Sequence, residues 1–401
     1  MSNDKHQEHF IYFILLTLAI IPSTIEIDIL APSLPSIGQY FQVDAGAAQN
    51  VITLNFIGFI LGALFYGPLS ERLSIRNVLL IGLFGIIVSS IGCYVSSSLD
   101  MLLFFRIIQG LSSCAVFIMV LASFPQIFEG SKIMSFLGYL NATTALCIAV
   151  APIIGNAINL ILSWREIFIF IGMLAGISFI LTFYFLRPTS LYHKKNKKLS
   201  FSVYRGFNHK TFVFPTCIVS LMSASHLIFI SSSSFIYEVF FSFSNKNYIL
   251  HYTCIILSFV IPSFLFNRIS TLLKGVERTE KCGLYLCVIS AISLLIHVDD
   301  PSLITLHQCL YCVGFSISSP IIFNRIMSAF PSQTGASSSM SVFIRNVISM
   351  VCLAVCSFTF AGNPAYLATE IAILNILIFC IWFIEKKHLS LNKKSKAFTL
   401  A

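Results

Sequence analysis

The chain has 401 residues, of which 57% are hydrophobic and only 10% are charged, and its mean hydropathy is +0.88. Soluble domains average about 25% charged residues, so a soluble protein of this size is excluded. We predict an all-α membrane protein with many spans. The net charge of +9 arises from 25 Lys and Arg against 16 Asp and Glu. We interpret this excess as a topology signal and expect no nucleic-acid partner.

Apolar segments of about 17–25 residues are long enough to cross a bilayer as helices. The sequence predicts twelve, at residues 10–30, 48–66, 77–95, 101–123, 132–157, 166–186, 211–232, 248–267, 281–298, 302–324, 335–360 and 364–384. Six precede and six follow the one long polar stretch. We therefore predict two pseudo-symmetric six-helix bundles, over 1–186 and 211–401, joined by a basic linker over 187–210.

The distribution of Lys and Arg predicts the orientation of the chain, because these residues collect on the cytoplasmic side. With a cytoplasmic N-terminus, 21 of them fall in cytoplasmic segments, and only Arg165 and Lys246 fall in outside loops. We therefore expect both termini in the cytoplasm of a bacterial cell. The predicted location is the cytoplasmic (inner) membrane, and we expect a monomer.

Two carboxylates interrupt the first predicted span, at Glu26 and Asp28. Each ionised carboxylate at the centre of a bilayer costs at least about 2.5–3.5 kcal/mol on insertion scales. Two residues apart on a regular helix, they point about 200° away from each other. We expect one of them to face a central pathway and the other a neighbouring helix.

Arg106 is a buried base at a matching depth. It lies about 9 Å, or six residues, inside the fourth span, and Asp28 lies about 10 Å inside the first. A buried arginine needs a partner, and Asp28 or Glu26 is the acid at that level in this half of the chain. The pair is either a static clamp between two helices or a functional pair that opens on protonation or substrate binding.

The second half carries fewer charges inside its spans. Arg345 and Glu370 lie on consecutive spans, so we predict an ion pair between them, of either structural or functional purpose. His226 lies in a serine-rich run and is interpreted as an interior group or a functional one. The nine histidines and twelve cysteines are dispersed. We expect no metal site, no cofactor and no enzymatic activity.

Four motifs are recognisable along the first half. They are D-I-L-A-P-S-L-P at 28–35, G-P-L-S-E-R-L-S-I-R at 67–76, R-I-I-Q-G at 106–110 and A-P-I-I-G-N at 151–156. With these motifs the chain resembles the major facilitator superfamily. Within it, the chain is most similar to the twelve-span drug:proton antiporters of the bicyclomycin/chloramphenicol-resistance (Bcr/CflA) type.

The resemblance implies a role for particular residues. It assigns proton coupling to Arg106 and favours Asp28 over Glu26 as the coupling acid. It implies a conformational latch in the loop after the second span, formed by Gly67, Glu71, Arg72 and Arg76. It implies an antiporter motif in the fifth span, containing Pro152 and Gly155. The sequence departs from the family pattern at Glu71, Ser74, Ile75, Ala151 and Asn156, and Glu26 and Arg345 are additional charges.

These features predict an exporter of a small organic solute, a drug or a metabolite, driven by proton antiport with alternating access. The solute, protons and the bilayer are then its partners, and the proton gradient is its driving force. One alternative is a proton-coupled importer or siderophore-type carrier of an anionic ligand. Another is a membrane sensor or scaffold that transports nothing.

Overall fold

The computed structural model describes residues 2–70, 72–128, 131–186, 207, 209–359 and 363–398. These residues form helices joined by short turns, and no strand occurs among them. They group into two compact units, Met1–Arg205 with Phe330–Phe343, and Gly206–Ala329 with Ile344–Ala401. We call these the N-terminal and C-terminal units and describe each by itself. The predicted linker lies almost wholly outside the described residues.

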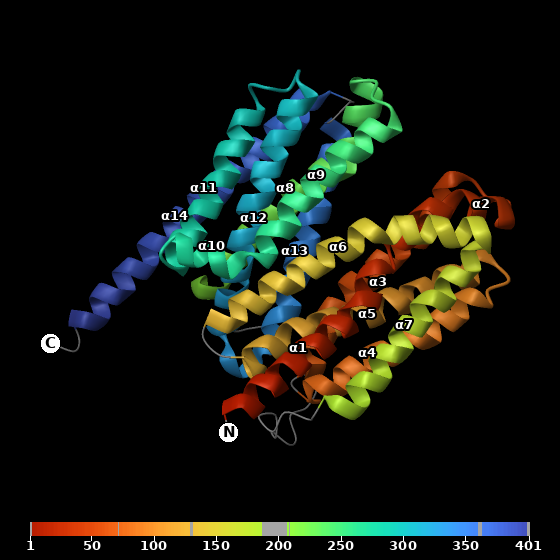
Figure 1. The fold of residues 1–401 in the computed structure, drawn as a ribbon, viewed down its shortest axis with the longest axis horizontal. Coiled ribbons are helices and arrows are strands. Elements are labelled where there is room, and N and C mark those ends of the chain that lie inside the picture. Colours follow the sequence, from red (N-terminus) through yellow and green to blue (C-terminus); the bar gives the residue numbers. More distant parts are fainter. Residues whose placement is uncertain are drawn as a thin grey trace. The chain divides into compact units, whose positions relative to one another are not determined.

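Figure 1 shows the N-terminal unit with its long helices alongside one another and a short helix, α2, at one end. Its elements are α1 (Ser2–Ile25), η1 (Asp28–Ser33), α2 (Leu34–Phe41), α3 (Ala45–Ser70), α4 (Ile75–Tyr94), α5 (Leu99–Ile127), α6 (Ser131–Ile161) and α7 (Trp164–Phe185). The helix α5 is the best-buried span of this unit. It packs against α3 and α4 along its length.

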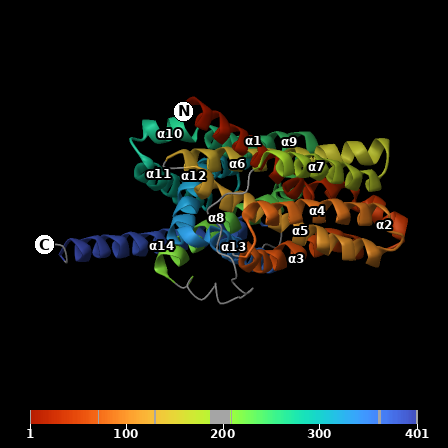
Figure 2. The same cartoon turned by 90° about the horizontal axis from the view of Figure 1, so that it is seen from below.

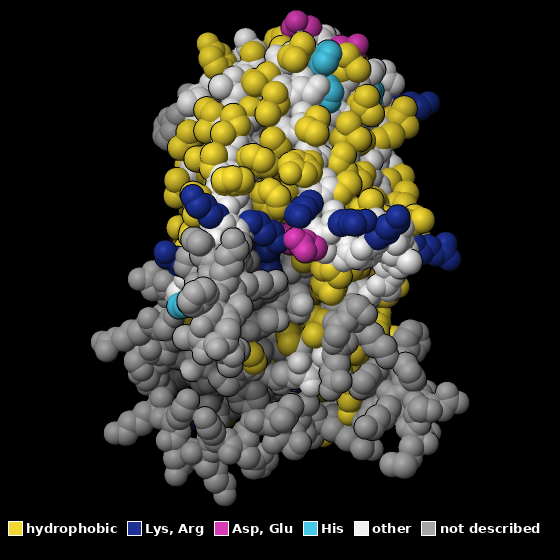
Figure 3. Space-filling view, turned by 90° about the vertical axis from the view of Figure 1, so that its left-hand side faces the viewer, with side chains coloured by type: hydrophobic (Ala, Val, Ile, Leu, Met, Phe, Trp, Pro, Cys, Tyr) yellow, Lys and Arg dark blue, Asp and Glu magenta, His cyan; other side chains and the backbone are white. Residues whose placement is uncertain are grey.

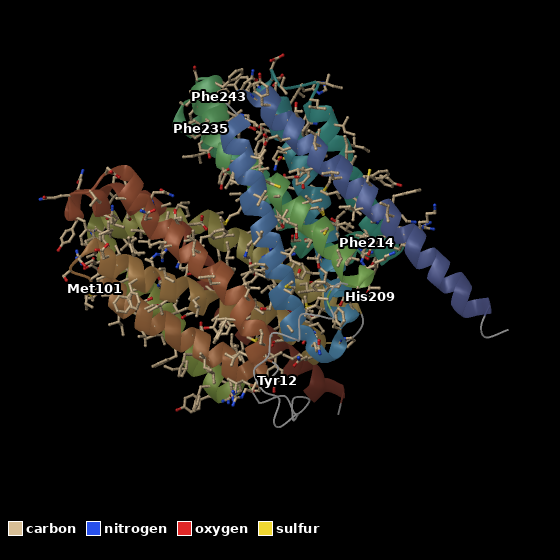
Figure 4. All side chains as sticks on the ribbon, turned by 180° about the vertical axis from the view of Figure 1, so that it is seen from behind. Tyr12, Met101, His209, Phe214, Phe235 and Phe243 are labelled. Carbon is tan, nitrogen blue, oxygen red and sulfur yellow. The ribbon has the colours of Figure 1, made fainter. Side chains whose placement is uncertain are left out.

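The C-terminal unit is built in a similar way, and its last helix, α14, extends past the ends of its neighbours (Figure 2). Its elements are α8 (Lys210–Ser234), η4 (Phe235–Phe240), α9 (Asn245–Phe264), α10 (Phe266–Leu272), α11 (Val276–Leu294), α12 (Pro301–Ala329) and α14 (Pro364–Phe398). The helix α13 (Thr334–Thr359) follows the short turn η5 (Pro331–Gln333) and is divided between the two units. Figure 4 places Phe235 and Phe243 at the end of the C-terminal unit opposite to His209.

Eleven helices in the described part of the chain are long and apolar enough to cross a membrane. Each corresponds to one predicted span. The remaining predicted span, 281–298, corresponds to α11. This helix begins earlier than expected and carries Glu277, Arg278, Glu280 and Lys281 in its first turns. These charges lower its apolar character, although its later turns are apolar.

Small residues allow the closest helix contacts, as the Gly58 and Gly62 spacing predicts. A Cβ on Gly58 would overlap the backbone carbonyl of Ile107, and one on Gly110 would overlap the carbonyl of Asn55. The helices α3 and α5 therefore meet backbone to backbone. This contact brings Asn55 next to the turn of α5 that carries Arg106.

The first span is broken where the sequence suggested a continuous helix. The helix α1 ends at Ile25, and a tight 3-10 turn, η1, begins at Asp28. Pro32 explains the break, because a proline has no N–H and its ring clashes with the carbonyl four residues earlier. That carbonyl belongs to Asp28. The two acids therefore flank a helix break, and the 200° relation expected for a regular helix does not apply.

Candidate functional site: a buried arginine network and an open carboxylate

Arg106 is fully buried in the N-terminal unit, and its guanidinium is held mainly by oxygens of uncharged groups. Its Nε donates to the carbonyl of Val51 at 2.8 Å. Its Nη1 donates to Oε1 of Gln109 at 2.6 Å and to the backbone carbonyl of Glu26 at 3.4 Å. The arginine thus ties α5 to α3 and to the residue that follows α1.

Glu26 is also fully buried and joins the same network through an amide. Asn55 Nδ2 donates to Glu26 Oε1 at 3.1 Å and to the backbone carbonyl of Arg106 at 3.2 Å. Within the described part of the chain, Glu26 Oε2 and Arg106 Nη2 are buried without a hydrogen-bond partner. A direct ion pair between the two side chains is not among the described interactions. The carboxylate and the guanidinium are therefore each hydrogen-bonded only in part.

The network continues across α5 to α4. Gln109 accepts from Arg106 through its oxygen, and its Nε2 donates to the hydroxyl of Ser90 at 2.9 Å. Each of these side chains is buried. The amide of Gln109 thereby links the guanidinium of Arg106 to Ser90 of α4. The sequence pattern R-I-I-Q-G shows both residues at i and i+3, on one face of a helix.

Asp28 differs from Glu26 in its surroundings. It is only partly buried and begins η1. Among the described residues, no residue other than Asp28 itself forms a hydrogen bond or an ion pair with its carboxylate. Of the two acids considered as partners of Arg106, the structure brings Glu26 to the arginine. We call the carboxylate of Asp28 open, because it is not paired with another described residue.

The predicted pair of Arg345 and Glu370 is not formed, and this expectation is wrong. Glu370 instead accepts a hydrogen bond from Thr359, and the guanidinium of Arg345 lies 5.7 Å from the ring centre of Phe323. Measured from the end that α13 and α14 share, Arg345 is about 21 Å along its helix and Glu370 about 9 Å. Two helices that are consecutive in the chain therefore need not carry their charged residues at the same depth.

The C-terminal unit has a polar layer of its own, without charge. Gln308 Nε2 lies 3.3 Å from Nδ1 of His226, and the thiol of Cys312 lies 3.7 Å from the same nitrogen. The imidazole also contacts the rings of Phe259 and Phe315. Sequence analysis left the role of His226 open, and the structure gives it an amide partner in the interior of the unit.

Charges of the C-terminal unit gather instead at one end of its helices. Arg325 Nη2 lies 2.9 Å from Glu280 and 3.5 Å from Glu385. Lys386 lies 3.4 Å from Glu280, whose other oxygen accepts from Trp382. Figure 3 shows the band of basic side chains in which an acidic side chain is embedded. Sequence analysis missed this cluster, because its members come from three helices and lie far apart in the sequence.

Of the residues assigned to a latch, Gly67 is buried near the end of α3, and Glu71 lies outside the described residues. Arg72 is exposed. Arg76 donates from Nη2 to the carbonyl of Phe183 at 2.6 Å. This contact fastens α4 to the end of α7, so at least one base of the motif has a structural partner within its unit.

The residues of the predicted antiporter motif lie where α6 packs against η1. Pro152 is inside α6, and a Cβ on Gly155 would overlap the backbone carbonyl of Ile29. Ile29 is the neighbour of Asp28. The motif thus sets how closely α6 approaches the broken segment that carries the open carboxylate.

These observations define the class of the protein, a multi-pass helical membrane protein with ionisable side chains buried at membrane depth. The model of the Major Facilitator Superfamily matches residues 16–354, and the chain belongs to this family. It is a transporter rather than an enzyme. Both the predicted fold class and the family resemblance are confirmed.

Relatives with transport and resistance names are similar to this chain. The uncharacterized MFS-type transporter YdgK of Bacillus subtilis is 25% identical over 297 residues, which are 73% of each chain. A chloramphenicol resistance protein of Pseudomonas aeruginosa is 30% identical over 152 residues, which are 38% of this chain and 36% of the relative. The solved structure of the proton:xylose symporter XylE has a TM-score of 0.70 at 14% identity, over 95% of this chain and 96% of that one. This last likeness concerns the fold alone.

Proposed function

We propose that the protein exports a small organic solute in exchange for protons, by alternating access. The observation that carries the proposal is the different state of its two membrane-embedded acids. Glu26 is engaged with Asn55 inside the Arg106 network, whereas no hydrogen bond or ion pair joins the Asp28 carboxylate to another of the described residues. A membrane-embedded ionisable group without a structural partner is a functional group by default.

In this proposal the two acids have different roles. Glu26 and Arg106 form the fixed part, because their hydrogen bonds to α3 and α5 hold them in place. Asp28 takes a proton from one side of the membrane, and its ionised form interacts with the solute or with the polar groups around it. Antiport requires that proton and solute weaken each other's binding. A single carboxylate at a helix break satisfies this requirement, since it serves one of them at a time.

The name of the Pseudomonas relative supports chloramphenicol as the first compound to try as a solute. The experiment uses inside-out vesicles from cells that produce the protein. Vesicles that acidify their interior should accumulate labelled chloramphenicol, or another compound from a panel of toxic solutes, above the level of vesicles without the protein. A proton uncoupler should abolish this accumulation. Gradient-stimulated uptake by whole cells would instead favour an importer, and the absence of flux for every compound would favour a sensor.

A further inference from the structure

A second cluster of titratable side chains lies in the C-terminal unit, where α11 and α12 are joined. His297 lies in the turn after α11, and His307 lies in the second turn of α12. The sequence has no Lys or Arg from residue 282 to residue 324, whereas Asp299 and Asp300 lie in the same turn. Figure 3 shows histidine and acidic side chains at the end of this unit that is away from its basic band.

The two imidazoles share a set of donor atoms. His307 Nε2 lies 3.2 Å from His297 Nδ1. His297 Nδ1 lies 3.0 Å from the backbone carbonyl oxygen of Ser293, and His307 Nε2 lies 3.5 Å from the hydroxyl of the same serine. Four donor atoms from three residues therefore lie within 3.0–3.5 Å of a neighbour in the set.

The three separations are close to the distance between two neighbouring ligands of one metal ion. Ligands at 2.0–2.1 Å in a tetrahedral arrangement are about 3.3–3.4 Å from one another. Imidazole nitrogen combined with oxygen is the donor set that suits zinc, nickel and copper among divalent ions. His307 is 8% exposed and its Nδ1 has no hydrogen-bond partner among the described residues. The described polar contacts of this buried imidazole therefore all fall on Nε2, the nitrogen that faces His297 and Ser293.

We propose that His297 and His307 bind one divalent transition-metal ion such as Zn²⁺, with oxygens of Ser293 and water in the remaining positions. Asp299 and Asp300 make the local potential negative and so favour a cation. The site joins the end of α11 to α12 within one unit and does not depend on the transport activity. Sequence spacing did not reveal it, because its two ligands are ten residues apart across a turn.

The experiment is a titration of the purified full chain, made without a polyhistidine tag, with Co²⁺ as a spectroscopic substitute for Zn²⁺. We expect one equivalent to bind, with visible bands of nitrogen and oxygen ligation, and Zn²⁺ to displace it while Mg²⁺ does not. His297→Gln and His307→Gln should each weaken the binding by at least about tenfold, since loss of even an outer contact of a metal site costs that much. His251→Gln is the matched control, because His251 contacts Thr305 and lies outside the pair.

Three results would overturn the proposal. One is the absence of saturable binding, which would identify the cluster as hydrogen-bonded imidazoles only. Another is equal binding by wild type and by both histidine variants, or loss of binding when His6 and His9 are replaced instead. The third is a thiolate charge-transfer band, which would assign the metal to cysteine. Thermal unfolding without metal checks each variant, and His297→Gln, which changes a half-buried turn residue, decides alone if His307→Gln does not fold.

Discussion

The two units each bury a polar layer at the same place in equivalent helices, but only the layer of the N-terminal unit is charged. Arg106 is the seventh residue after Leu99, the start of α5, and Gln308 is the seventh after Pro301, the start of α12. Both helices have 29 residues. Transporters with repeated halves conserve such correspondences. The comparison shows that one repeat can hold a guanidinium where the other holds an amide.

The difference between Arg106 and Gln308 places the buried charge inside the spans in the N-terminal unit. In the N-terminal unit, Arg106 donates to the backbone carbonyl of Glu26, just after α1. In the C-terminal unit, the amide of Gln308 contacts His226 of α8. The ion pairs of the C-terminal unit that the structure describes lie near helix ends, where the bases Arg325 and Lys386 are partly exposed and the acid Glu280 is buried. We therefore expect proton coupling to depend on the N-terminal layer and folding to depend on both.

The largest expected effect follows Arg106→Ala. It leaves the buried Glu26 carboxylate without a cation nearby, and breaking such a buried arrangement costs about 3–5 kcal/mol. Transport should be abolished and the unfolding temperature lowered, as measured in detergent by thermal scanning. Gln308→Ala, the matched change in the other unit, removes a neutral group and should cost only about 1–3 kcal/mol. Equal losses from the two variants would contradict the comparison.

Glu26→Gln tests which acid belongs to the arginine. The glutamine keeps the shape and still accepts from Asn55, but it removes the negative charge near Arg106. We expect partial destabilisation, about 1–3 kcal/mol, with some proton-driven flux retained. Flux in vesicles and thermal stability are the measurements. Complete loss of coupling with unchanged stability would show that Glu26, and not Asp28, carries the proton.

Close backbone packing should matter in both units, and to a similar degree. Gly110→Ala places a methyl group against the Asn55 carbonyl, and Gly314→Ala does the same against the carbonyl of Gly283. Overpacking of this kind costs about 1–3 kcal/mol. Thermal unfolding of the two variants measures it. Because Gly110 lies next to the arginine network, only Gly110→Ala should also reduce transport. A loss of transport in Gly314→Ala alone would contradict the assignment of proton coupling to the N-terminal layer.

His226→Gln should have the smallest effect. The substituted amide can still meet Gln308, and no charge is gained or lost with neutral histidine. We expect a change of at most about 1 kcal/mol in stability and an unaltered dependence of flux on the proton gradient. A shifted pH profile for His226→Gln would show that the C-terminal layer also titrates.

Much of the fold was predictable from the sequence, because span length, apolar composition and the distribution of basic residues depend on local stretches. The burial of Arg106 near an acid was predictable from depth along two helices. The choice between Glu26 and Asp28 was not, since it depends on the helix break that Pro32 produces. Asn55 and Ser90 were also missed as members of the site. Single amides and hydroxyls are frequent in spans, and only three-dimensional contact separates those that meet the guanidinium.

The failure of the Arg345–Glu370 pair has a related cause. Consecutive helices predict proximity, but side chains pair only at equal depth. Arg325 was counted as a topology signal, and Glu280 and Glu385 were overlooked. The sequence does not show that their three helices bring these side chains to the same depth. Depth within a span was informative for Arg106, and applying it to Arg345 would have excluded the pair.

The most direct test of the central claim is proton-driven flux in vesicles containing Asp28→Asn. The matched control is Asp44→Asn, because Asp44 is an exposed acid of the same unit that caps α3, and asparagine preserves the cap. We predict that Asp28→Asn folds normally and still exchanges solute across the membrane, but no longer accumulates it when a proton gradient is applied, while Asp44→Asn behaves as wild type. Full gradient-driven accumulation by Asp28→Asn would contradict the account.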